Sequence, residues 1–389
     1  MGSELNERMN IIRIIAFTGV IVLLAQGCCG TCRTENVVTI DFETAELMID
    51  WLDLAAAGAS DVTLRSHFFE HIASSLGCQA IIRHWARFRE WDENIFYDFI
   101  LEAAGINTTD QPLIDEEGML TSFGKRRELW SAALTDPDRL REKLQALKEA
   151  DPRKAAISLA RRYLPRDADI TNEFYIVLFG GSNAFSVGDV NGYDLLQMPL
   201  TTDGDLNIPD ILRTFAHELH HTGFSNAASI GMRYIENTSR FEMVGLLAAE
   251  GMATWLISRP LDHLEEYRSA PDENARGVAR DWDRLLSQLP EIYRRAESDI
   301  RRNLAGELDQ DELIAYWLTG YQGPAYTLGS DMTALIEKHL GHRVLRTIPD
   351  DYRFFLEMYN RAARKALKRG EAVFLFDESL VESITSYQN

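Results

Sequence analysis

Cysteine is scarce in this chain and is concentrated near one end. The 389 residues include four cysteines, of which Cys28, Cys29 and Cys32 lie close together near the N-terminus. Only Cys78 lies in the body of the chain, which excludes a disulfide-stabilised scaffold. Cys29 and Cys32 have the C-x-x-C spacing, but no second pair exists to complete a four-thiolate zinc site.

Positive charge is also in short supply. Forty lysines and arginines stand against sixty acidic residues, for a net charge of −20. Phosphate binding needs clustered basic residues, so we expect no nucleic-acid partner. The one notable basic run, "RAARKALKRG" at 361–370, has the spacing of a solvent-exposed helix face. A hydrophobic content of 46% with 26% charged residues is typical of a globular protein.

The N-terminal apolar run is too short for a comfortable membrane span. Ile14–Ala25 has 12 residues, against about 20 for a transmembrane helix, and it fits the core of a signal peptide. The preceding Glu4 and Glu7 are unfavourable there. Translation from Met9 would leave Arg13 as the only charged side chain before the run, so we expect Met9 to be the start.

The end of this run resembles a lipoprotein signal. Gly27 precedes Cys28, which would receive lipid and become the mature N-terminus, although Ala25 and Gln26 depart from the usual pattern. An uncleaved anchor and plain secretion are the alternatives. We therefore expect residues 1–32 to be a targeting segment, and the protein to be extracytoplasmic, either secreted or attached to a membrane by lipid or by its hydrophobic segment.

The pattern predicts a predominantly helical α+β protein. Apolar residues recur at three- and four-residue spacing through 41–165, which we expect to be a helical N-terminal region. Residues 166–389 form the second predicted region. It begins with a strand in "NEFYIVLFGG" and a strand pair in "NAFSVGDVNGYDLLQMPL", with a tight turn around Asn191-Gly192. Helices then resume to about Lys368, and "AVFLF" near the end predicts a short strand.

The helix after this small sheet is marked at both predicted ends. In "NIPDILRTFAHELHHTG", Pro209 suits the first helical position, Asp210 the first turn and Gly223 the end. His217 and His221 are four residues apart, so both imidazoles project from one face and can bind one ion.

Together with Glu218 these histidines form the pattern H-E-x-x-H, in which two histidines bind Zn²⁺ and the glutamate activates a water molecule. His220, at a variable position of the motif, is expected to make a helix-face contact. The inverted pattern "HFFEH", with His67 and His71, has no comparable acidic residue downstream, and we expect it to be structural.

A zinc site of this kind needs a third protein ligand. Glu250 lies alone in the apolar segment "MVGLLAAEGMATWLI", where burying a carboxylate costs several kcal/mol, on the order of the polar-burial penalty, unless it meets a positive partner. The small residues Gly251 and Ala253 would allow another helix to approach closely. Glu236 and Glu242 have more polar neighbours and are predicted to be surface residues. A position of Glu250 at the solvent edge of a helix is the alternative.

The combination of "AHELHH" with "AAEGMATWL" resembles the gluzincins, the thermolysin-like zinc peptidases. More closely, the chain is similar to an uncharacterised prokaryotic family assigned as zinc-dependent peptidases, over roughly half its length. The resemblance implies that His217, His221 and Glu250 are the metal ligands and that Glu218 is the general base. It also implies that the strand segment 184–198 borders the cleft and pairs with an extended peptide substrate.

Such a reaction also needs a donor for the oxyanion. In "YWLTGYQGPAYTLG" the tyrosines are Tyr316, Tyr321 and Tyr326, and nearby glycines and proline predict that the latter two lie in a loop. We select Tyr326. The leading hypothesis is a zinc metallopeptidase that acts on peptides or proteins. The alternatives are a non-catalytic, peptide-binding lipoprotein of the same fold and a cytosolic helical scaffold with a chance motif.

Overall fold

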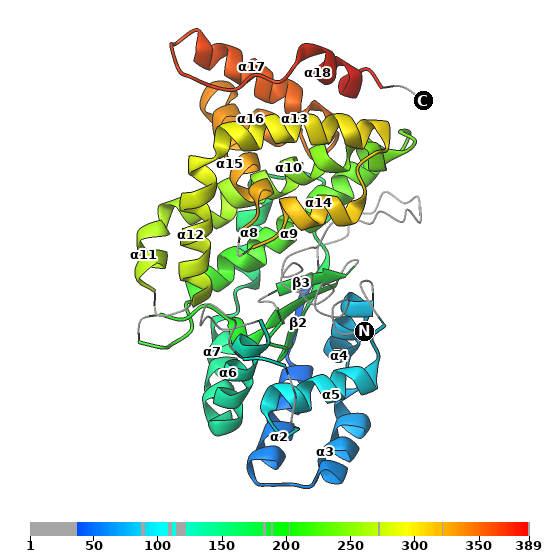
Figure 1. Ribbon diagram of the computed structural model, residues 1–389, viewed down its shortest axis with the longest axis vertical. Coiled ribbons are helices and arrows are strands. Elements are labelled where there is room, and N and C mark those ends of the chain that lie inside the picture. Colours follow the sequence, from blue (N-terminus) through cyan, green and yellow to red (C-terminus); the bar gives the residue numbers. More distant parts are fainter. Residues whose placement is uncertain are drawn as a thin grey trace. The chain divides into compact units, whose positions relative to one another are not determined.

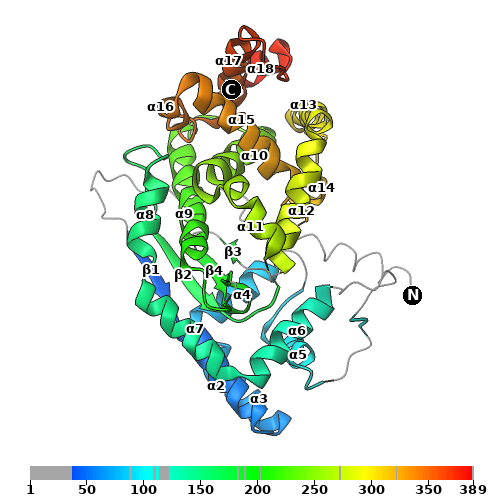
Figure 2. The ribbon, with the colours of Figure 1, turned by 90° about the vertical axis from the view of Figure 1, so that its left-hand side faces the viewer.

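The computed structural model describes residues 37–86, 90–107, 111–113, 122–181, 184–187, 190–201, 203–270, 273–320 and 322–387 (Figures 1 and 2). The expected targeting segment 1–32, with its lipid site at Cys28, lies outside these residues and stays a prediction, as does the position of Tyr321. The described chain divides into two compact units. One comprises 37–153 and 172–211, and the other comprises 154–171 and 212–389. The predicted division into 41–165 and 166–389 stays a prediction.

The first unit contains a small mixed sheet. Its strands lie in the order β1-β2-β4-β3 and have the bounds β1 (Val38–Asp41), β2 (Asn172–Val177), β3 (Ala184–Val187) and β4 (Val190–Asp194). β2 pairs in parallel with β1 and β4, and β3 pairs antiparallel with β4. This sheet confirms the predominantly helical α+β class, although the sequence patterns did not predict β1.

Six helices accompany this sheet in the described part of the first unit, and two of them, α2 and α4, contact its strands. Their bounds are α2 (Glu43–Ala56), α3 (Asp61–His67), α4 (Leu76–Ala86), α5 (Glu93–Ala104), α6 (Ser122–Thr135) and α7 (Pro137–Ala150). A π-helical turn, η2 (Phe68–Ile72), follows α3, and a 3-10 turn, η3 (Leu195–Gln197), follows β4. α2 and α4 pack against β2, whose side chains are buried at every position except Glu173.

The prediction of a turn at Asn191-Gly192 was wrong, because both residues lie inside β4. β3 and β4 pair antiparallel, with Val187 opposite Val190. A Cβ on Gly192 would lie 2.0 Å from the ring of its cross-strand partner Phe185. The glycine therefore makes room for an aromatic ring and does not form a turn.

The second unit is built from helices. Their bounds are α8 (Arg153–Arg161, of which the first residue belongs to the first unit), α9 (Ile208–Gly231, which begins in the first unit), α10 (Glu242–Ala253), α11 (Leu264–Ser269), α12 (Glu273–Ser287), α13 (Leu289–Ala305), α14 (Gln310–Trp317), α15 (Pro324–Leu340), α16 (His342–Leu345), α17 (Phe355–Leu367) and α18 (Glu378–Thr385). Short turns η4 (Thr238–Phe241), η5 (Thr254–Ser258), η6 (Pro260–Asp262) and η7 (Tyr352–Phe354) connect several of them. α10 and α15 lie side by side in this unit (Figures 1 and 2).

The predicted strand "AVFLF" (372–376) was wrong, since these residues adopt neither helix nor strand. Side chains of α17 satisfy the backbone in place of a neighbouring strand. The hydroxyl of Tyr359 donates to the carbonyl of Phe374, and the amide of Asn360 donates to the carbonyl of Phe376. Hydrogen bonds from two side chains of α17 thus attach the segment to that helix.

Among the described residues, one helical run is both long and strongly apolar, namely Thr238–Asp262, which includes α10. By length and composition alone it could cross a membrane, but 83% of its most apolar window is buried inside the protein. Every side chain of α10 from Met243 to Ala253 is buried. The run therefore behaves as the core helix of the second unit.

Candidate metal centre

The two motif histidines are presented by α9. The helix begins at Ile208, next to the predicted Pro209, but it continues past the predicted end at Gly223 to Gly231. A Cβ on Gly223 would lie 2.3 Å from a methyl group of Leu164 and 2.7 Å from one of Ile170. Gly223 therefore serves close packing inside the second unit, and the prediction that it ends the helix was wrong.

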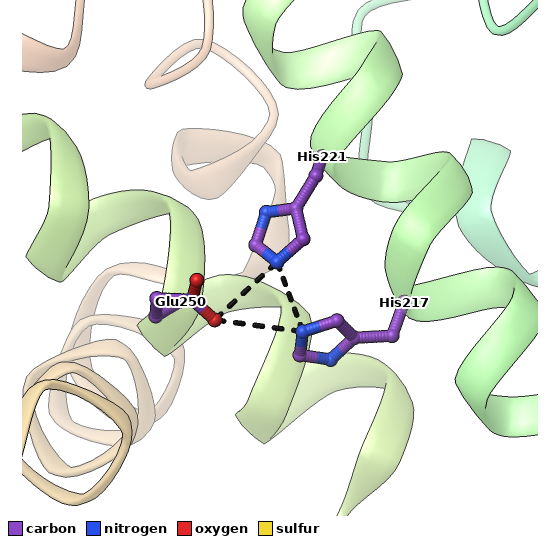
Figure 3. A group of neighbouring side chains, drawn as sticks. All are labelled: His217, His221 and Glu250. Atoms are coloured by element: carbon purple, nitrogen blue, oxygen red, sulfur yellow. Dashed lines mark hydrogen bonds and ion pairs between the residues drawn. The ribbon is translucent and has the colours of Figure 1, made fainter. Parts of the chain in front are cut away.

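Three predicted ligands converge at one point (Figure 3). His217 and His221 project from α9 toward Glu250 of α10, and one ligand atom from each lies within 4.8 Å of the others. Oε2 of Glu250 is 3.5 Å from Nε2 of His217 and 3.3 Å from Nε2 of His221. The two Nε2 atoms are 2.9 Å apart. Among the residues that the structure describes, this is the one such group of three or more metal-ligand side chains.

The spacing of these atoms suits a small cation. Two atoms bound at tetrahedral angles, each about 2.1 Å from a zinc ion, would be about 3.4 Å apart. The two carboxylate–imidazole distances match this value, and the imidazole–imidazole distance is shorter. Oε2 of Glu250 is buried and accepts no hydrogen bond of regular geometry within the described chain. A buried carboxylate oxygen that faces two ring nitrogens fits a zinc ion, which prefers this set of nitrogen and oxygen ligands.

The electrostatics of the group favour a protonated His221 beside an ionised Glu250. Burial by itself would lower the pKa of His221, but the carboxylates of Glu250 and Glu218 raise it well above its ordinary value. Burial would raise the pKa of Glu250, but the imidazoles of His221 and His217 hold it well below its ordinary range. Without a metal, a protonated His221 therefore neutralises Glu250, and a bound ion would take over that task.

A close helix crossing positions Glu250. A Cβ on Gly251 would lie 2.3 Å from the carbonyl carbon and oxygen of Gly329 in α15, so the two helices touch through their backbones. The expected close approach at Gly251 is confirmed. The carboxylate of Glu250 is buried with its helix, whereas the side chain of His221 is 16% exposed.

Glu218 and Tyr326 lie within electrostatic reach of the triad. Glu218 is buried, and its charge contributes to the raised pKa of His221. Burial and then the charges of Glu250 and Glu218 raise the pKa of Tyr326 well above its ordinary value. Tyr326 lies in the first turn of α15, so the prediction that it belongs to a loop was wrong. Pro324 at the start of α15 marks a helix start, a signal that the sequence did contain.

The other predicted residues lie outside this group. His220 is fully buried near Phe224, and burial lowers its pKa well below its ordinary value, so its imidazole is a neutral packing group. The ring of Tyr316 packs beneath the guanidinium of Arg295. His67 and His71 contact each other with ring centroids 4.9 Å apart and do not belong to the metal-ligand group.

Sequence reasoning missed Ser258. Its hydroxyl lies 2.8 Å from Nδ1 of His217, on the side of the ring away from the triad. Forty-one residues separate the two, and no pattern in the sequence connects them.

The comparisons with known proteins agree with this chemistry at the level of the family. No curated protein and no solved structure matches the chain. The model of one family, described as "Putative zinc dependent peptidase (DUF5700)", matches residues 81–367, which include all three members of the triad. The resemblance to a family of zinc-dependent peptidases is thereby confirmed, whereas the likeness to the gluzincins stays a prediction. Because the match covers well over half of its length, the chain belongs to the DUF5700 family.

Proposed function

We propose that the protein hydrolyses peptide bonds at a zinc ion held by His217, His221 and Glu250, with Glu218 as general base. The convergence of two Nε2 atoms and one carboxylate oxygen within 4.8 Å is the observation that carries this proposal. When bound, zinc acts as a Lewis acid that polarises the scissile carbonyl and lowers the pKa of a water molecule from about 16 toward about 7.

Glu218 moves the proton in this scheme. Its carboxylate takes a proton from the attacking water and returns it to the nitrogen of the leaving amine. Its burial and its electrostatic influence on His221 support this role, because the base must lie beside the ligands without being one of them. A purely structural metal site has no need of such a residue.

Tyr326 is the proposed donor to the oxyanion. Its raised pKa keeps the phenol protonated at neutral pH, and a protonated hydroxyl can donate a hydrogen bond where negative charge develops. The charges of Glu218 and Glu250 contribute to this raised pKa, and their influence on the phenol supports the assignment.

The substrate is proposed to be a peptide or protein outside the cytoplasm. The apolar run Ile14–Ala25 and the cysteine at position 28 support export, with attachment to a membrane by lipid or by the run itself. β3 lies at the end of the strand order, with one edge that pairs with no other described strand, and we propose that an extended peptide pairs there.

Metal content tests the site. Purified wild-type protein should contain one zinc ion per chain by atomic emission, and Glu250→Ala should lose it on dialysis against a mild chelator. Glu242→Ala, which removes a carboxylate from the same helix outside the triad, is the matched control and should keep its zinc. If the double variant His217→Ala/His221→Ala binds as much zinc as wild type, the assignment is wrong.

A further inference from the structure

The apolar helix α10 ends in a rare type of helical turn. α10 continues into the π-helical turn η5 (Thr254–Ser258), in which the backbone N–H of Arg259 donates to the carbonyl of Thr254, five residues earlier, over 2.8 Å. Arg259 then adopts a left-handed conformation, with φ of 47°, and ends the run. π-turns are rare and occur frequently at functional sites.

The π-turn decides which side chain faces the histidine helix. Two turns of an α-helix take about seven residues, and a π-turn adds one residue to that count. Glu250 and Ser258, which are eight residues apart, therefore lie on the same face of the helical run. In an unbroken α-helix, Ser258 would be rotated about 80° away from Glu250.

The contacts agree with this geometry. Oε2 of Glu250 faces Nε2 of His217, and the hydroxyl of Ser258 lies 2.8 Å from Nδ1 of the same ring. Thr254 lies one turn after Glu250, but its buried hydroxyl has no hydrogen-bond partner in the described part of the chain. Two side chains of one helical run thus face the two ring nitrogens of His217, with Glu250 beside Nε2 and Ser258 beside Nδ1.

We infer that Ser258 is a positioning residue that fixes the tautomer and orientation of His217. This inference rests on the proposed zinc site. A neutral histidine that binds a metal through Nε2 must carry its proton on Nδ1, and an acceptor for that proton holds the ring in place. In this arrangement Nδ1–H of His217 donates a hydrogen bond to the hydroxyl oxygen of Ser258, so the lone pair of Nε2 is directed toward Glu250 and His221.

The π-turn accounts for the position of Ser258 beside His217. Glu250 must enter the site from a helix that touches α15 at Gly251, which leaves little freedom to shift the helix axis. Adding one residue to a single turn rotates the residues that follow it relative to Glu250. Ser258 reaches the ring of His217 in this way, although it is only half-buried itself.

The full-length protein can be tested with three variants. Ser258→Ala removes the acceptor, Ser258→Thr keeps a hydroxyl, and Thr333→Val removes a different buried hydroxyl that has no hydrogen-bond partner within the described residues. Zinc affinity is measured by competition with a chromophoric chelator. The tautomer of His217 is read in the metal-free protein from two-bond ¹H–¹⁵N correlation spectra of ¹⁵N-histidine-labelled samples, with His217→Gln to identify the resonance.

We expect Ser258→Ala to weaken zinc binding about 10- to 100-fold, as is usual for the loss of a partner of a ligating histidine, and to shift His217 away from the Nδ1–H form. Ser258→Thr should restore both properties, and Thr333→Val should resemble wild type. An unchanged affinity or an unchanged tautomer in Ser258→Ala overturns the inference. If wild-type protein takes up no zinc, the proposed function fails instead, and the tautomer alone decides whether Ser258 positions His217.

Discussion

Gly251 and Gly329 bring α10 and α15 into backbone contact, since a Cβ on Gly251 would lie 2.3 Å from the carbonyl carbon and oxygen of Gly329. The contact lies one residue after Glu250 and one turn after Tyr326. The same crossing therefore supports both the third proposed ligand and the proposed oxyanion donor.

Gly251→Ala should separate the two helices. Backbone atoms cannot yield as a flexible side chain can, so we expect a loss of about 1–3 kcal/mol or more in the free energy of unfolding, together with weaker zinc binding. Urea unfolding and chelator competition measure the two effects. Gly245→Ala is the matched control on the same helix, because the atoms nearest to its Cβ would belong to the ring of Tyr352, at 3.1 Å, and not to a backbone. Equal stability of the two variants would contradict the backbone contact.

The approach of Glu250 to the histidines could be predicted because two local rules meet there. Residues four apart on a helix share a face, which pairs His217 with His221, and a carboxylate in an apolar segment needs a partner. Ser258 could not be predicted, since its position depends on a π-turn that no residue pattern marks.

The glycines show a second limit of prediction from sequence. A glycine that ends a helix or forms a turn looks the same in a sequence as one that makes room for a neighbour. Gly192 was assigned to a turn and Gly223 to a helix end, whereas both accommodate large apolar side chains, namely Phe185 and Leu164. Such contacts depend on how strands and helices pack together in three dimensions, so the role of each glycine could not be predicted from its neighbours in the sequence.

Glu218→Gln should separate metal binding from catalysis. The amide retains the size of the side chain but cannot take a proton, so zinc content should match wild type while peptide cleavage falls by at least about 100-fold. Cleavage of a fluorogenic peptide library, with zinc content measured on the same samples, checks both. Glu236→Gln, at an exposed position of the same unit, is the control and should retain activity. Loss of zinc from Glu218→Gln would mean that Glu218 is a ligand.

Tyr326→Phe should lower kcat with little change in KM. The lost hydroxyl is proposed to act only on charge that develops during the reaction, and removal of one such donor typically costs about 100- to 1000-fold in kcat. Steady-state kinetics on the best library peptide give the two constants. Thermal unfolding of the same variant separates this role from a structural one: a variant that loses stability but keeps its kcat would exclude Tyr326 as the donor.

Asp194 should give the first unit a distinct pH dependence. Its carboxylate is fully buried and accepts hydrogen bonds from the backbone N–H groups of Phe179, Gly180 and Leu196 and from the side chain of Gln197. Burial outweighs these hydrogen bonds and raises the pKa of Asp194 from 3.8 to about 6.

Between these two pH values the folded protein keeps a proton that the unfolded chain has released. The free energy of unfolding should therefore fall as pH rises from about 4 to about 6, by up to about 3 kcal/mol from this residue, and level off above pH 6. Asp194→Asn should remove this slope, although it lowers stability throughout because its NH₂ group cannot accept a hydrogen bond from the backbone.

Urea unfolding at half-unit pH steps measures the difference in the free energy of unfolding between wild type and variant. Asp138→Asn, at a side chain 87% exposed, is the control. A difference between wild type and Asp194→Asn that grows as pH rises from 4 to 6 would show that the hydrogen bonds outweigh burial.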